Sequence, residues 1–321
     1  MKLSAALRAS ALLAAVLALT SAPAAALDSL TIIAPAKPGG GWDQTARTLQ
    51  EVMQTQGIVP TVTVENVEGA GGTVGLAQFV GQHAGKGDTL LVGGLVMVGA
   101  ILTNAAPVTL DQVTPIARLT GEYEVLVVPA ASPIQSLADL IAAFKADPGA
   151  VAWGGGSAGG TDHILAGLIA QAAGVDPTLV NYIPFSGGGE ALAAILGGHV
   201  TVGISGYGEW AGQIASGELR ALAISSGERV AGIDIPTLKE QGIDVELANW
   251  RAVMGPPELS PEDRQALLDT VDKTVKSEAW QAQLKSRNWM DVYLAGDEFA
   301  AFLKAENERI TTTLKAIGLV E

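Results

Sequence analysis

The chain has 321 residues, of which 48% are hydrophobic, and a formal net charge of −14. It contains no cysteine, which excludes disulfides, thiolate metal sites, cysteine nucleophiles and a lipid anchor attached to cysteine. The acidic surface makes nucleic acid and anionic lipid poor partners, and it repels an anionic solute at long range. An anion site in this chain therefore has to be made locally, by backbone amides or a few placed cations.

The first 26 residues have the features of a secretory signal peptide. Lys2 and Arg8 precede an apolar stretch from Ala11 to Leu19, and residues 24–26 are three alanines that offer a cleavage site. The apolar stretch is too short for a membrane span, although an anchor or an apolar helix of the mature fold is the alternative. Cleavage before Leu27 leaves 17 basic against 33 acidic side chains, a formal charge of −16. We expect a periplasmic protein without a lipid anchor.

Short apolar strands alternate with amphipathic helices along most of the chain. The pattern predicts a strand at 30–34, a helix at 42–56, a strand at 61–65, a helix at 72–82, and then strands at 89–92, 125–128, 151–153, 179–182, 200–204 and 219–224 with helices between them. Such alternation is typical of parallel sheets covered on both faces. Two runs in succession predict an α/β fold of two doubly wound domains. The predicted first domain is 27–124 plus 250–321, and the second is 125–249.

The two predicted domains have no long linker between them. We expect strands near Glu122–Val128 and Glu246–Met254 to cross from one to the other. The C-terminal part of the chain, after the second of these strands, is helical and charged. Within it, Ser260-Pro261-Glu262 is typical of a helix start. Apolar residues from Phe299 to Ile317 recur at helical spacing, which predicts a helix that packs against one domain.

Glycine-rich turns follow four of the predicted strands, at 38–43, 68–73, 154–162 and 186–190. A glycine-rich turn before a helix lets a ligand approach unpaired N–H groups, which the positive end of the helix dipole supports. In open α/β sheets these turns lie at the carboxyl ends of strands, where ligands bind. Four such turns in two domains could line one cleft from both sides. The alternative is that the glycines only make tight turns.

Several segments match a known family in the same order. They are PAKPGGGWDQTAR at 35–47, VENVEGAGGTVG at 64–75, and the stretches 155–163, 187–200 and 219–223. In this succession the sequence resembles the solute-binding proteins of tripartite tricarboxylate transporters, the Bug family. The resemblance implies a type II periplasmic-binding-protein (Venus-flytrap) fold with a cleft between the domains. It also implies two membrane subunits as partners and a small organic carboxylate as ligand, with tricarboxylates such as citrate favoured. We expect no cofactor, no metal and a monomer.

In that family, loop amides of one domain hold a ligand carboxylate, and waters bridge it to the loops of the other. Carried onto this chain, the candidate ligand-binding residues are Lys37, Gly40, Gly41, Trp42, Asp43, Gly71, Gly72, Thr73, Gly156, Ser157, Thr161, Asp162, Ser186, Gly187 and Tyr207. Lys37 could meet a further carboxylate or remain solvated, and Asp43, Thr161 and Asp162 could instead cap helices. Trp42 could line the cleft mouth or pack; we expect Trp42→Ala to weaken binding with little loss of fold.

A serine hydrolase is the alternative from another class, because GGSAG at 155–159 matches the nucleophile elbow. A hydrolase would need a histidine beside Ser157. His83 precedes the serine, His163 lies in the helix that the turn opens, and His199 comes 42 residues later. Three scattered histidines without cysteine also give no metal site. We therefore expect a binding protein without catalytic residues; transport and sensing use the same closing cleft and stay open.

Overall fold

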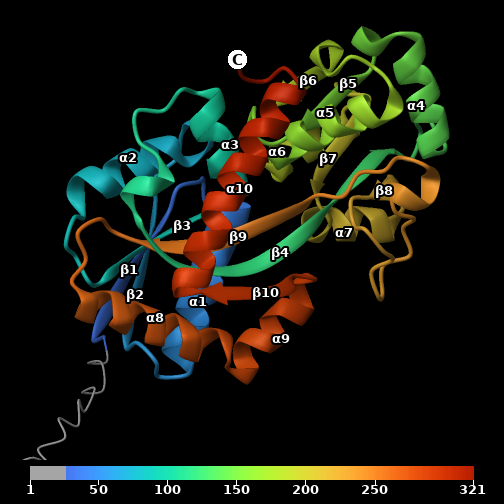
Figure 1. Ribbon diagram of the computed structural model, residues 1–321. Helices are drawn as coiled ribbons and strands as arrows, with labels where there is room; N and C mark the ends of the chain where they lie inside the picture. The colour runs from blue at the N-terminus through green and yellow to red at the C-terminus, as the bar shows by residue number, and fades with distance from the viewer. Residues whose placement is uncertain (1–26) are drawn as a thin grey trace, which may run out of the picture.

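The computed structural model describes residues 27–321, so the predicted signal peptide (1–26) lies outside the described residues. The chain forms two lobes (Figure 1). In the first lobe, three parallel strands stand in the order β2-β1-β3 and alternate with helices. These elements are β1 (Ser29–Ala34), α1 (Gly41–Thr55), β2 (Thr61–Asn66), α2 (Thr73–Gln82), β3 (Thr89–Gly94) and α3 (Leu95–Thr103). The predicted alternation is confirmed here.

The second lobe repeats this architecture. Its strands β7, β5 and β6 are neighbours in that order and run parallel. The elements are α4 (Leu137–Ala146), β5 (Ala152–Gly155), α5 (Thr161–Ala173), β6 (Asn181–Pro184), α6 (Gly188–Leu196), β7 (Val202–Gly206), α7 (Tyr207–Ser216) and β8 (Leu219–Ile224). The strand predicted at 179–182 begins two residues late, because Pro177–Leu179 form a turn of 3-10 helix instead.

Two long strands join the lobes, as the sequence predicts. The first part of β4 (Thr114–Pro129) pairs with β9 (Ala248–Gly255), and its last part pairs with β7 and β8. All these pairings are antiparallel, so each lobe has a mixed sheet rather than a purely parallel one. The protein is therefore α/β with two doubly wound halves. The predicted domain boundaries fall inside β4 and β9 and stay a prediction.

The C-terminal part adds α8 (Pro261–Val275), α9 (Glu278–Arg287), β10 (Met290–Ala295) and α10 (Gly296–Ala316). The Ser260 hydroxyl accepts a hydrogen bond from the Asp263 amide at 3.0 Å, which confirms the predicted start of α8. The sequence did not predict β10, which pairs antiparallel with β4. Between residues 27 and 321, no helix combines the length and the apolar composition needed to cross a bilayer.

The last helix packs mainly against the first lobe, as predicted, but its end also contacts the second. Helix α10 packs on β4 and α3, but it runs along both lobes and ends beside the second (Figure 1). At that end Ile317 lies against Gly167 of α5 so closely that an added Cβ on the glycine would be 2.8 Å from the isoleucine Cδ1. Apolar residues at helical spacing show that a helix is buried on one face, but not which neighbours cover each turn.

Candidate functional site

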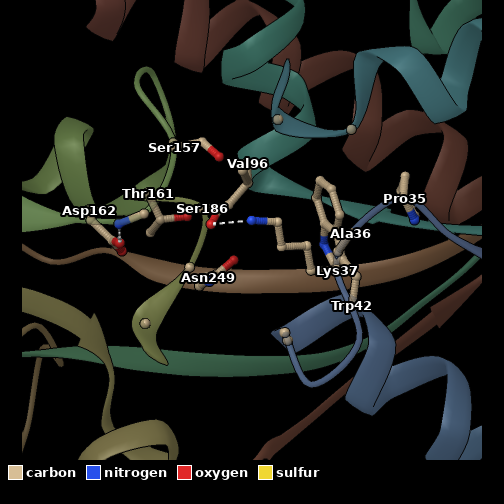
Figure 2. Close-up of a pocket in the computed structure, with 18 of the residues that line it drawn as sticks. Pro35, Ala36, Lys37, Trp42, Val96, Ser157, Thr161, Asp162, Ser186 and Asn249 are labelled. Atoms are coloured by element: carbon tan, nitrogen blue, oxygen red, sulfur yellow. Dashed lines mark hydrogen bonds between the residues drawn. The ribbon is translucent and has the colours of Figure 1, made fainter. Parts of the chain in front are cut away.

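A cavity of about 360 Å³ lies between the lobes, within the size range of small-molecule sites. Figure 2 shows its walls, with the first lobe and the second lobe facing each other across it. The residues that line it are 35–37, 40–42, 68–72 and Val96 from the first lobe, 156, 157, 160–162, 186–188, 205, 206 and 209 from the second, and Asn249 and Arg251 from β9. The four glycine-rich turns therefore meet at one site.

Six helices begin at this cavity, and each is preceded by a glycine. The N-cap residues of α1, α2, α3, α5, α6 and α7 are Gly40, Gly72, Gly94, Gly160, Gly187 and Gly206. None of these six helices has a side-chain cap hydrogen bond. By contrast α4, α8 and α9, which do not line the cavity, are each capped by a serine hydroxyl. The Gly208 amide of α7 is bonded to Glu122 at 2.9 Å, and α10, away from the cavity, also has no side-chain cap. The cavity still gathers several positive dipole ends and N–H groups without a side-chain cap, the features that bind an anion.

Asp43 holds the first predicted glycine-rich turn, at 38–43, in place. This carboxylate accepts hydrogen bonds from the Gly39 amide at 2.7 Å and the Asn66 amide group at 2.9 Å, and it pairs with Arg47 at 2.9 Å. Burial opposes the ionised form, but the hydrogen bonds from Arg47, Gly39 and Asn66 outweigh it and lower the pKa of Asp43. Asp43 does not line the cavity, so the structure places it in a supporting position.

The turn between β5 and α5 is held in a similar way. Asp162 accepts a hydrogen bond from the Gly156 amide at 2.5 Å, and the Tyr182 hydroxyl donates to the Gly156 carbonyl at 2.9 Å. The Gly159 amide donates to Nδ1 of His163 at 3.1 Å, and this imidazole stacks on the Tyr182 ring. The amide at 156, which lies on the predicted ligand-binding loop, is therefore already bonded within the protein.

Lys37 crosses the mouth of the cavity. Its Nζ donates to Glu190 Oε1 at 3.1 Å and to Ser186 Oγ at 3.3 Å, and the latter bond is drawn in Figure 2. The hydrogen bond to Glu190 raises the pKa of the lysine, and those from Ser186 and Lys37 lower the pKa of Glu190 to about 2. Lys37, which the sequence left either solvated or bound to a solute carboxylate, thus joins the two lobes through an exposed ion pair.

Trp42 lines the cavity but is only 8% exposed and belongs to the main hydrophobic core. Its ring packs on Gly72, where an added Cβ would lie 2.5 Å from Cζ3 of the indole. Gly72 also has a φ of 90°, a conformation that glycine adopts without strain. The expectation that Trp42→Ala spares the fold is therefore not supported, since removing a buried indole leaves a large void.

Twelve of the fifteen candidate residues line the cavity, and three do not. The three are Asp43, Thr73, whose hydroxyl donates to the Ala70 carbonyl at 3.0 Å, and Tyr207, which packs beside the core of the second lobe. The sequence reasoning missed Val96, Glu209, Asn249 and Arg251 as individual residues. Asn249 and Arg251 had a signal, because they are two residues apart on a predicted crossover strand and so share one face.

The floor of the cavity is acidic. Arg251 pairs with Glu122 at 2.8 Å, and both side chains are buried where β9 meets β4. Burial, opposed by the hydrogen bond from the Gly156 amide, raises the pKa of Asp162 to about 6. Burial and the charge on Glu122 raise the pKa of Glu209 to about 7. Glu124 lies fully buried beside them, and burial raises its pKa well above the ordinary value.

The geometry around Ser157 does not match a hydrolase. Within residues 27–321, no hydrogen bond joins its hydroxyl to a histidine or a carboxylate. His163 is turned toward Tyr182 and accepts from a backbone amide, and burial lowers its pKa to about 4. In the same residues, no group of three histidine, aspartate or glutamate side chains is arranged to hold a metal ion.

The fold and the cleft define a two-lobed binding protein of the type II periplasmic kind. The family model described as "Tripartite tricarboxylate transporter family receptor" matches residues 45–319. Protein BugT of Bordetella pertussis is 30% identical over 295 residues, which cover 90% of this chain and 89% of BugT. The chain therefore belongs to the tripartite tricarboxylate transporter receptor family, as its sequence motifs indicated.

Solved structures share this fold across most of the chain. A protein from R. palustris solved with adipate has a TM-score of 0.82 at 22% identity, covering 90% of this chain and 97% of its own. MatC from Rhodopseudomonas palustris, solved with bound malate, has a TM-score of 0.74 at 23% identity, covering 90% and 98%. At these identities the likeness extends to the fold, and ligand choice has to be argued from this chain's own residues.

Proposed function

We propose that this chain is a periplasmic solute-binding protein that captures a small organic carboxylate and delivers it to two membrane subunits of a tripartite tricarboxylate transporter. The observation that carries the proposal is that six helices with glycine as the N-cap residue begin at one cavity. The backbone amides at these helix N-termini offset the repulsion that a net charge of −14 exerts on an anion. Hydrogen bonds to a charged group contribute about 1.5–3 kcal/mol each, so a few of them suffice for micromolar affinity.

The twelve lining candidates are the proposed contacts, with the carboxylate on the amide at Gly71, since the Gly72 amide already donates to the Gly69 carbonyl at 2.9 Å. These two glycines have φ values of 62° and 90°, so their backbone conformation is one that side chains disfavour. The second lobe then closes over the solute by bending where β4 and β9 cross. We assign the chain no catalytic role, and its predicted signal peptide directs it to the periplasm. Relatives in structures hold adipate and malate, which supports a carboxylate and leaves citrate as one candidate among several.

The test is thermal unfolding of the mature protein against di- and tricarboxylates, amino acids and aromatic acids. A ligand at about 100 times its Kd stabilises by about 2.7 kcal/mol, which for this size raises Tm by about 5–10 °C. Gly187→Val supplies the site variant, because an added Cβ there meets nothing within 4 Å and the residue lines the cavity. Gly189→Val is the matched control, equally unobstructed but outside the cavity lining.

We expect a shift for one class of carboxylate, its loss in Gly187→Val and its retention in Gly189→Val. Absence of any shift with every carboxylate contradicts the proposal. Loss of the shift in both variants contradicts the placement of the site. Co-purification of the two membrane subunits with the loaded protein tests the delivery step.

A further inference from the structure

The cavity is polarised between its two walls. In the first lobe, α2 and α3 carry no acidic residue in their first turn. The acidic residue in the first turn of α1, Asp43, is already paired with Arg47. In the second lobe, α5, α6 and α7 each carry one, namely Asp162, Glu190 and Glu209. A first-turn acid offsets the positive end of its helix dipole. Apart from Glu68, which lies at the mouth near Lys37, the first wall therefore favours an anion and the second does not.

Of the three acids on the second wall, Glu209 has neither a cation nor a backbone amide as a partner in the described part of the chain, and only the Ser205 hydroxyl bonds to it. Glu190 pairs with Lys37, and Asp162 accepts from the Gly156 amide. Among residues 27–321, neither a backbone amide nor a cationic side chain donates to Glu209. Its carboxyl group rests on Gly188, where a Cβ would overlap it and would lie 2.7 Å from Ser205 Oγ. The absent side chain at 188 leaves room for an acceptor facing the cavity.

A second observation on the same wall points to a ligand. Thr161 is 1% exposed and lines the cavity, yet its hydroxyl has no hydrogen-bond partner. Figure 2 shows this hydroxyl directed into the cavity beside Asp162 and opposite Lys37. Buried hydroxyls are nearly always hydrogen-bonded, so this group requires a partner that enters the cavity. Thr161 and the acids beside it therefore form one incomplete set of polar contacts.

The charged groups around this wall leave a deficit of positive charge. Glu122, Glu124, Asp162 and Glu209 face one another here, and Arg251 is the cation that the described residues place among them. Arg251 is already bonded to Glu122. Glu124 is completely buried, burial raises its pKa well above the ordinary value, and its carboxyl group hydrogen-bonds to Asp162, so it is a neutral member of the group. A solute that brings a positive charge to this wall would supply what the protein itself lacks.

We propose that the second-lobe wall, through Glu209, Asp162 and the Thr161 hydroxyl, binds a protonated amine of the solute, which makes the solute an amino-carboxylate. The proposal rests on the proposed function, because the carboxylate end still binds the amides of the first lobe. It narrows the solute to one class: a small acid that carries an ammonium group beside or opposite its carboxylates. A plain dicarboxylate fills the first wall and leaves the second wall's acceptors unused.

The experiment is isothermal titration of matched pairs that differ only in the amine: aspartate and succinate, glutamate and glutarate, 2-aminoadipate and adipate. In wild type we expect the amino member of at least one pair to bind about tenfold tighter or more, since hydrogen bonds to charged groups are strong. Glu209→Gln should remove this preference without weakening the plain dicarboxylate. Glu68→Gln, on the opposite wall, is the control and should keep the preference.

The pH dependence gives an independent readout. Because the pKa values of Asp162 and Glu209 are raised to about 6 and about 7, an ammonium solute should bind more weakly as the pH falls from 8 to 5. A carboxylate placed against the same acids would show the opposite trend, since it requires their protonation. Equal affinity within every pair, a Glu209→Gln change that affects both members alike, or tighter binding at low pH overturns the inference. If no acid of either kind binds, the proposed function fails with it; if only plain acids bind, the proposed function stands alone.

Discussion

Arg251 and Glu122 make the ion pair on which the junction of the lobes depends, and removing the arginine tests that role. The Nη2–Oε2 distance is 2.8 Å, and the two side chains are 4% and 3% exposed. The other Glu122 oxygen accepts from the Gly208 amide at 2.9 Å, which ties α7 to β4. Arg251→Met keeps much of the volume but leaves Glu122 charged and buried near Glu124. Breaking a buried pair on one side costs about 3–5 kcal/mol.

A loss of that size should lower Tm by about 10 °C in a protein of this length. Glu122→Gln in the Arg251→Met background removes the stranded charge, so the double variant should recover most of the stability. The measurement is urea unfolding of wild type, both single variants and the double variant, analysed as a double-mutant cycle. An Arg251→Met protein within about 1 kcal/mol of wild type, or strictly additive effects, would refute the reasoning.

The other predictions concern the cavity and its charges. Trp42→Ala should lower the free energy of unfolding by about 3–5 kcal/mol, and an unchanged urea midpoint would contradict the packing described for the indole. Gly156→Leu should reduce carboxylate affinity while Gly212→Leu, whose Cβ meets nothing within 4 Å, leaves it unchanged in titration calorimetry. The solute-free protein should lose stability as the pH rises from about 4.5 to 7, because folded Glu209 retains its proton there and the unfolded chain releases it; Glu209→Gln should flatten that slope in thermal scans. Lys37→Gln should weaken binding only a few-fold, since the exposed pair with the second lobe contributes little, and high salt should abolish the difference.

The local patterns in the sequence predicted the architecture well because they depend on short-range rules. The strand at 30–34 and the helix at 42–56 lie within a residue or so of β1 and α1. Strand β10 was not predicted from the sequence, because it is half-exposed along nearly its whole length and shows no alternation between buried and exposed residues. The glycine turns were found for a physical reason, since a position that must bring backbone amides to a cavity excludes most side chains.

The features that sequence could not supply depend on residues far apart in the chain. The Glu122–Arg251 pair follows from the register of β4 with β9, in which Thr120 stands opposite Arg251 and Glu122 opposite Asn249. Nothing in the local pattern of either strand fixes that register. Likewise a glycine turn predicts accessible amides, but not that Asp162 of the following helix occupies the one at Gly156. The acids that set the character of the second wall were therefore visible only once the helices were placed.

The way the lobes are joined explains how binding can be coupled to closure. The strands β4 and β9 are continuous across the junction and pair along it from Thr114 to Tyr123. Across the mouth of the cavity, the contact from Lys37 to Glu190 is an exposed ion pair, which stabilises the closed form only slightly. Buried groups without partners, such as the Thr161 hydroxyl, meanwhile disfavour a closed cavity that is empty. A solute that hydrogen-bonds to both walls removes that penalty and adds its own contacts, so its differential affinity for the two forms sets the closed population.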